Sequence, residues 1–175
     1  MLNLKYPVPE GFLNEETRRD YTISETMKKA WAVQMDLFQE LMRVCKEHNL
    51  RVFADSGTLI GAVREKGFIP WDDDIDVAML REDYDKLLAL SAEFKDPYYL
   101  QTISTHPYYI NRYAQLHMKG TTAIRTDGKP QRHQQNIFID IFVIDTLPSN
   151  PRALKRHYVK VRKANQKLKL VRKLT

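Results

Sequence analysis

Apolar residues recur every three or four positions between residues 27 and 45, a spacing typical of a helix with one buried face. Thr22 to Glu25 has the form of a capping box, in which the threonine oxygen and the glutamate satisfy free backbone donors at a helix start. The pattern therefore predicts a long helix that begins after this box and ends near residue 48. Further helices are predicted over residues 56–64, 83–94 and from Pro151 onward.

Short apolar runs lie between these helices and predict the strands of a sheet. The predicted strands cover residues 51–55, 75–80, 98–103, 113–118, 122–126 and 137–145. Residues 127–135 have the composition of a loop. The order of elements predicts an α/β (α+β) fold with a small mixed sheet flanked by helices. We expect one domain over residues 1–150, followed by an amphipathic helix over residues 151–175.

The composition is that of a globular protein, with 43% apolar and 29% charged residues in a chain of 175. It excludes neither an enzyme nor a binding module. The single Cys45 permits no intramolecular disulfide, which favours a reducing compartment. No run of about 18 apolar residues is present to span a bilayer, and the first residues lack a signal peptide's hydrophobic region. A cytoplasmic protein is expected.

The charge is unevenly distributed. All 22 acidic residues precede residue 151, whereas residues 152–175 carry 10 of the 28 basic residues. This asymmetry indicates that the tail contacts an anionic surface, either membrane headgroups or nucleic acid. A solvated basic helix is the alternative.

Four aspartates gather between residues 72 and 76, directly before a predicted strand. In an extended chain, Asp72, Asp74 and Asp76 can point one way while Asp73 points the other. Two carboxylates about 4 Å apart repel by roughly 4 kcal/mol at an effective dielectric near 20, so a bound cation would stabilise the cluster. Carboxylate, phosphate and water oxygens are the ligands that Mg²⁺ prefers. The pattern therefore predicts a site for Mg²⁺ or Mn²⁺.

Asp140 is an isolated charge within the apolar run 137–144, where it needs a partner. It is the candidate third acid of a two-metal site; a carboxylate bonded to a backbone or arginine donor is the alternative. A calcium-binding EF-hand also begins with aspartates spaced by two. Here, however, Val77 occupies the position of the required glycine, and Asp83 that of the bidentate glutamate.

Residues 55–64 and 66–77 resemble the LicD family of phosphocholine transferases, which is related to the fukutin-related proteins. Weaker similarity continues to the strand with Asp140, so the resemblance covers roughly residues 25–150. It implies a nucleotidyltransferase-like domain, in which a Gly-Ser or Gly-Thr turn opens a helix that faces the metal-binding aspartates. Members of the family usually continue well beyond this length. The chain is therefore expected to be a short member or a fragment that ends at the start of a C-terminal region.

By this resemblance, Asp74 and Asp76 form the catalytic metal pair, Asp72 is an additional ligand, and Asp140 is the acid on the third strand. The residues expected to bind substrate are Gly57, Thr58, Arg64, Lys66 and Trp71.

Each of these assignments has an alternative. A glycine at a helix start allows close approach of phosphate to backbone amides, although Gly57 can serve the turn alone. Arg64 and Lys66 can bind phosphate or be ordinary surface charges. Trp71 can stack on a base or a cationic headgroup, or pack in the core.

The resemblance implies transfer of phosphocholine, or a similar phospho-headgroup, from a donor such as CDP-choline. The implied acceptor is a sugar hydroxyl of a cell-surface glycan such as teichoic acid or lipopolysaccharide. A lipid-linked acceptor would suit peripheral contact of the basic tail with the inner membrane face. Two alternatives stay open: transfer of a nucleotidyl or ribitol-phosphate group, and a non-catalytic nucleotide- or nucleic-acid-binding module. The absence of a helix-turn-helix or zinc signature disfavours nucleic acid.

Overall fold

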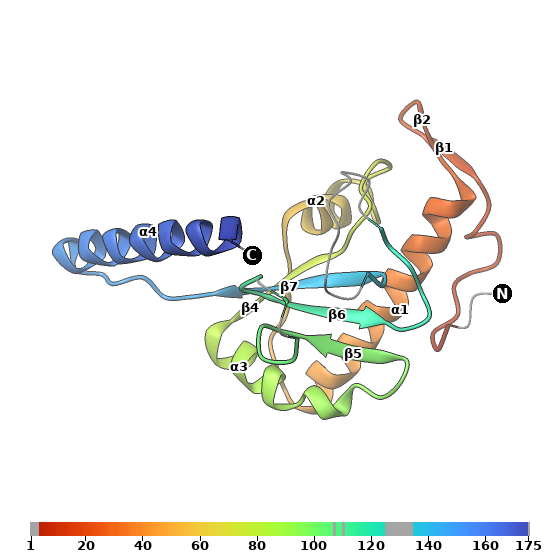
Figure 1. The fold of residues 1–175 in the computed structure, drawn as a ribbon. Coiled ribbons are helices and arrows are strands. Elements are labelled where there is room, and N and C mark those ends of the chain that lie inside the picture. The colour runs from red at the N-terminus through yellow and green to blue at the C-terminus, as the bar shows by residue number, and fades with distance from the viewer. Residues whose placement is uncertain (1–3, 107, 110, 125–134, 175) are drawn as a thin grey trace. The chain divides into compact units, whose positions relative to one another are not determined.

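The computed structural model describes residues 4–106, 108–109, 111–124 and 135–174, without the side chains of 170–174 (Figure 1). Its contacts divide the chain into two units, Met1–Ile144 and Asp145–Thr175, and each is described by itself. The organisation expected from the sequence, with a catalytic domain over residues 1–150, stays a prediction.

The first unit contains a mixed five-stranded sheet with the order β3-β4-β7-β6-β5 (Figure 1). β4 and β7 are parallel neighbours, and the other neighbouring pairs are antiparallel. The predicted α+β class with a small mixed sheet is thus confirmed. The strands are β3 (Phe53–Ala54), β4 (Asp76–Leu80), β5 (Tyr98–Gln101), β6 (Ala114–Met118) and β7 (Phe138–Ile144).

The strand predicted at residues 122–126 is wrong for its described part, because Thr122 to Ile124 form no regular structure. Residues 125 and 126 lie outside the described residues, as does most of the predicted loop at 127–135.

Helices connect and cover the strands. α2 (Ser56–Arg64) leads from β3 toward β4, and α3 (Arg81–Ala89) follows β4 directly. The helix predicted over 83–94 is split, because a separate 3-10 turn, η1, occupies Ser91–Glu93. α1 (Glu25–Glu47) packs its apolar face against the sheet, as predicted. Its buried residues Leu37 and Leu41 belong to the same core as strand residues of β4, β6 and β7.

The start of α1 differs from the prediction. Ser24 is the cap, since its hydroxyl accepts a hydrogen bond from the backbone N–H of Met27 at 3.2 Å. The expected capping box with Thr22 is wrong, because Thr22 pairs with Thr17 in a two-stranded hairpin. This hairpin consists of β1 (Glu16–Arg18) and β2 (Tyr21–Ile23).

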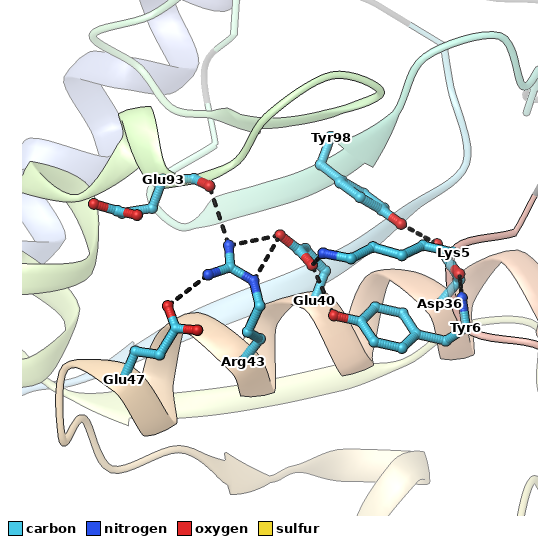
Figure 2. A network of polar contacts seen from close by, with 8 residues as sticks. All are labelled: Lys5, Tyr6, Asp36, Glu40, Arg43, Glu47, Glu93 and Tyr98. Atoms are coloured by element: carbon cyan, nitrogen blue, oxygen red, sulfur yellow. Dashed lines mark hydrogen bonds and ion pairs between the residues drawn. The ribbon is translucent and has the colours of Figure 1, made fainter.

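Two acidic residues on the buried side of α1 anchor the N-terminal segment (Figure 2). Asp36 accepts hydrogen bonds from the Tyr6 backbone N–H at 2.7 Å and the Tyr98 hydroxyl at 2.5 Å. Lys5 and Arg43 each lie 2.7 Å from a Glu40 carboxylate oxygen. Burial alone would raise the pKa of Glu40, but hydrogen bonds from Arg43, Lys5 and Tyr6 lower that pKa to about 2. The network therefore joins the segment before the hairpin to α1 and β5.

The second unit contains α4 (Pro151–Leu174). Asn150 begins this helix, since its side-chain oxygen accepts from the backbone N–H groups of Arg152 and Ala153. Tyr158 and Val159 are exposed on it. Peripheral membrane contact of this basic helix stays a prediction. Among the residues that the structure describes, no helix combines the length and apolar character needed to cross a lipid bilayer.

Candidate active site

Carboxylates from separate stretches of the chain meet at one end of β4 and β7. Asp76 is the first residue of β4, and Asp140 lies opposite it in register on the parallel strand β7. In-register residues of neighbouring parallel strands point to the same face about 4.8 Å apart, so these two aspartates are side by side. The structure thus brings together the acids that the sequence identified on two strands.

The acidic loop, residues 72–75, precedes β4 and adds three more carboxylates. One ligand oxygen each from Asp72, Asp73 and Asp74 lies within 4.8 Å of the others. The expectation that Asp73 points away from its neighbours is wrong. The alternation of faces applies to strands, and β4 begins only at Asp76, so the loop can turn all three carboxylates together.

Two residues of α1 hold the acidic loop from behind. Trp31 Nε1 donates to the carbonyl oxygen of Asp72 at 2.9 Å, and Gln34 Nε2 donates to that of Asp73 at 2.6 Å. The Trp31 ring also stacks on Phe68 with centroids 4.5 Å apart. The sequence reasoning missed both roles. The available signal was a polar Gln34 three residues after Trp31, on the apolar stripe of the helix.

The start of α2 fixes Asp76. Thr58 Oγ1 accepts from the backbone N–H of Asp76 at 2.8 Å, and the backbone N–H of Asp55 donates to the carbonyl oxygen of Asp76 at 3.0 Å. Asp55 also caps α2 through its side chain, which accepts from the N–H of Ser56. Asp55 is a sixth acid near the cluster that was not among the expected site residues, although aspartate before a helix is a common cap.

Gly57 lies against the acidic loop. A Cβ atom at this position would lie 2.1 Å from Asp72 Oδ2, so the Asp72 carboxylate occupies the space that any larger residue needs. The close approach expected of this glycine is therefore made by a protein carboxylate. Its contact with a phosphate stays a prediction.

Asp140 has a buried polar partner. Gln115 Nε2, on β6, donates to Asp140 Oδ1 at 2.8 Å, and Gln115 Oε1 lies 3.2 Å from His117 Nε2. Gln115 and His117 are both buried. In the alternative interpretation, Asp140 was expected to accept from a backbone or arginine donor. The donor in the structure is instead the side-chain amide of Gln115.

Burial and mutual repulsion raise the pKa values of four of the clustered carboxylates. Burial, and then the charges of Asp76, Asp72 and Asp73, raise the pKa of Asp74 to about 6. Burial raises the pKa of Asp140 to about 7, with smaller contributions from Asp76 and Asp74 and an opposing hydrogen bond from Gln115. Burial and neighbouring acids also raise the pKa values of Asp72 and Asp76. A cluster of oxygen donors that repel one another fits a hard divalent cation.

These shifts predict how stability depends on pH without divalent metal. A raised carboxyl pKa means that the folded state binds more protons than the unfolded state, so stability falls as pH rises through about 6 and 7. In EDTA, the unfolding midpoint should decrease between pH 5 and pH 8, and Asp140→Asn should flatten this decrease. Glu10→Gln, at an exposed position, is the control. An unchanged slope in Asp140→Asn would contradict the assignment.

Two cavities open beside Asp74. The hairpin cavity, of about 670 Å³, is lined by residues of β1, α1, α2 and the acidic loop. The β7 cavity, of about 700 Å³, is lined by residues of α1, the acidic loop, residues 122–124 and the start of β7. Asp74 lines both, so a group bound in either cavity would be close to the carboxylates.

The expected substrate-binding residues divide into two groups. Gly57, Thr58 and Lys66 line the hairpin cavity together with Asp72 and Asp74.

Arg64 and Trp71 are absent from the described lining of both cavities. Arg64 Nε instead pairs with Glu65 at 2.7 Å. Trp71 is half-exposed, and its ring forms a T-shaped pair with that of Tyr21. Neither residue therefore lines a cavity beside Asp74, and their roles in substrate binding stay predictions.

The sequence is similar to a known protein family and to several known proteins. Residues 49–168 match the family described as LicD/FKTN/FKRP, nucleotidyltransferase domain. The lipopolysaccharide cholinephosphotransferase LicD of Haemophilus influenzae is 31% identical over 131 residues, which cover 74% of this chain and 48% of that protein. Uncharacterized proteins of Rickettsia prowazekii and Rickettsia typhi are each 35% identical over 83 residues, or 47% of this chain and 30% and 26% of theirs. The matched segment thus spans about half or less of these relatives.

Proposed function

This chain belongs to the LicD/FKTN/FKRP nucleotidyltransferase family, and from that premise we propose that it transfers phosphocholine, or a similar phospho-headgroup, to a glycan hydroxyl. The relative from Haemophilus influenzae, a lipopolysaccharide cholinephosphotransferase, supports a lipopolysaccharide acceptor; teichoic acid is the other candidate. A cytidine nucleotide such as CDP-choline is the proposed donor. The observation that carries the proposal is the convergence of the acidic loop with Asp76 and Asp140 beside two cavities.

The proposal includes a divalent metal, Mg²⁺ or Mn²⁺. Asp74, Asp76 and Asp140 would hold it, with Asp72 as an additional ligand. The fit rests on oxygen donors alone and on pKa values that burial and mutual repulsion raise. When bound, such an ion neutralises phosphate charge in the transition state.

In the reaction, the acceptor oxygen forms a bond to the phosphorus of the headgroup phosphate. The bond from that phosphorus to the bridging oxygen breaks, and the nucleoside monophosphate leaves with the electron pair. The hydroxyl proton must pass to a base. Asp140 is our candidate, because it lies beside Asp76 in the strand register and Gln115 binds only one of its two carboxylate oxygens.

Calorimetric titration of CDP-choline, with and without Mg²⁺, tests the proposal. We expect binding only with Mg²⁺. The protein should then be incubated with lipopolysaccharide and with CDP-choline, CDP-ribitol or CDP-glycerol, and the products read by mass. A phosphocholine adduct supports the proposal. An adduct from another donor, or transfer of the nucleotide, would replace phosphocholine as the transferred group. Metal-independent binding without any product would replace the enzyme with a binding module.

The contact between Gln115 and Asp140 gives a prediction about pH. The hydrogen bond from Gln115 lowers the pKa of Asp140, so Gln115→Met should raise it. Because the base must be deprotonated, the acidic limb of kcat/KM against pH should move upward by up to about one pH unit. Gln101→Met, at another buried glutamine that is in neither cavity lining, is the matched control. A profile that falls in height without moving would contradict proton transfer to Asp140.

A further inference from the structure

We propose that Arg18 and Lys28 bind the phosphate groups of the donor in the hairpin cavity, and that Glu16 pairs with these two cations when the donor is absent. The inference rests on the proposed function, because it names residues that would bind that donor. Both cations precede residues 49–168, so they lie outside the segment that the family match covers.

Lys28 is a buried cation at the wall of this cavity. Only 5% of it is exposed, and its ammonium pairs with the Glu16 carboxylate. It lies 5.0 Å from the ring centroid of Phe12 and 5.5 Å from that of Trp31. A charged lysine in such surroundings requires an anionic partner. The partner that it has is Glu16, whose side chain is 39% exposed and so lies at the solvent side of the wall.

Arg18 shares the same carboxylate. Its Nε lies 2.9 Å from Glu16 Oε1, but the pair lacks hydrogen-bond geometry, and this buried N–H has no hydrogen-bond acceptor among the described residues. The guanidinium carbon lies 5.9 Å from the centroid of the Trp31 ring. One carboxylate therefore faces two cations, and one donor group is left without an acceptor.

The charge of the two cavities differs. Lys66 adds a third cation to the hairpin cavity, which also contains Asp72 and Asp74. The β7 cavity has no lysine or arginine among its described lining residues, and contains Ser24, Thr26 and Gln34 instead. Of the two cavities beside Asp74, the hairpin cavity complements an anion with cations. A diphosphate there could contact Arg18 and Lys28 from one side and metal held by the acidic loop from the other.

Removing the charge of Glu16 tests the proposal, because the two explanations predict different changes in anion affinity. If the ion pairs serve only to hold the hairpin, removing Glu16 weakens the fold and does nothing favourable for ligands. If Glu16 competes with phosphate, Glu16→Gln should tighten anion binding, while Arg18→Gln should weaken it. Charge-assisted hydrogen bonds of this kind correspond to about a tenfold change in affinity in each direction.

The experiment is calorimetric titration of the full chain with inorganic pyrophosphate and with CDP, in the presence of Mn²⁺. We expect weaker binding of both in Arg18→Gln, partial recovery in Arg18→Lys, and tighter binding in Glu16→Gln. Lys29→Gln is the matched control, since Lys29 is an exposed neighbour on α1 that pairs with Glu25. The Mn²⁺ affinity should be the same in all variants.

Unchanged pyrophosphate affinity in folded Arg18→Gln would overturn the proposal, and so would weaker binding in folded Glu16→Gln. Thermal unfolding identifies a variant that fails to fold. If Glu16→Gln fails to fold, the affinity of Arg18→Gln alone tests the proposal, because this variant keeps the pair of Glu16 with Lys28. Because pyrophosphate and CDP contain no headgroup, these results do not depend on transfer of choline. Absence of phosphocholine transfer together with the expected affinities would refute the proposed function and leave this inference standing.

Discussion

Asp74→Asn and Asp76→Asn should each lower turnover about a thousandfold or more, because each removes a carboxylate proposed to hold the metal on which charge stabilisation depends. Binding of Mn²⁺ should weaken in both variants. The fold should persist, since burial and then repulsion between neighbouring acids raise the pKa values of Asp74 and Asp76. Without metal at pH 8, the unfolding midpoint of Asp74→Asn should equal or exceed that of the unaltered protein.

Turnover of CDP-choline, calorimetry with Mn²⁺ and thermal unfolding measure these three effects. Asp85→Asn is the matched control, because Asp85 is an exposed aspartate on α3 that pairs with Arg81. Full activity in both site variants would refute the assignment of the acids. Loss of activity accompanied by loss of folded structure would refute the claim that the cluster is electrostatically unfavourable without metal.

Gly57→Ala should lower activity about a hundredfold and destabilise the protein by about 1–3 kcal/mol, the usual cost of overpacking. The added Cβ would lie 2.1 Å from Asp72 Oδ2 and 3.1 Å from Asp72 Cγ, so either the carboxylate or the start of α2 must move. Small displacements of catalytic groups are costly, because catalysis depends on their placement. Denaturant unfolding and steady-state kinetics measure the two effects.

Gly67→Ala is the control, since a Cβ atom on Gly67 would meet nothing within 4 Å. A second variant separates packing from chemistry. In Gly57→Ala combined with Asp72→Ala, the clash is removed, so stability should recover while activity stays low. Recovery of activity would show that the Asp72 carboxylate is dispensable, and wild-type behaviour of Gly57→Ala alone would contradict the close packing.

Local patterns in the sequence were enough to predict the main elements of the first unit. The 3.6-residue period identified α1, because a helix that covers a sheet must bury one face along its whole length. The isolated charge of Asp140 in an apolar run and the acids before β4 predicted two strands with carboxylates at their ends. The parallel register that sets Asp140 beside Asp76 was not predicted, since pairing of distant strands leaves no local signal.

The hairpin was missed for a definite physical reason. Arg19 and Asp20 join β1 to β2 with φ values of +52° and +59°, in the left-handed region. Tight hairpin turns usually place Asn, Asp or Gly at such positions, and Arg-Asp does not have that signature. The hairpin also supplied the partner strand that removed Thr22 from the expected helix cap.

Some contacts of the candidate residues could not be predicted from the sequence. Arg64 was expected to bind substrate, and in the structure its guanidinium pairs with the adjacent Glu65. Conversely, Trp31 was expected only as a core residue, and its indole N–H reaches a backbone oxygen 41 positions further along the chain. Neither periodicity nor composition reports which polar groups pair with one another.

The position of α1 has a consequence for how the family segment can be isolated. A polypeptide that began at residue 49 would keep all the aspartates proposed as metal ligands and all of β4 and β7. It would lose the Trp31 and Gln34 donors behind the acidic loop, and it would uncover core residues that Leu37 and Leu41 shield. The segment that matches the family therefore lacks groups that support both the acidic loop and the core, and excision at its boundary should yield an aggregating product.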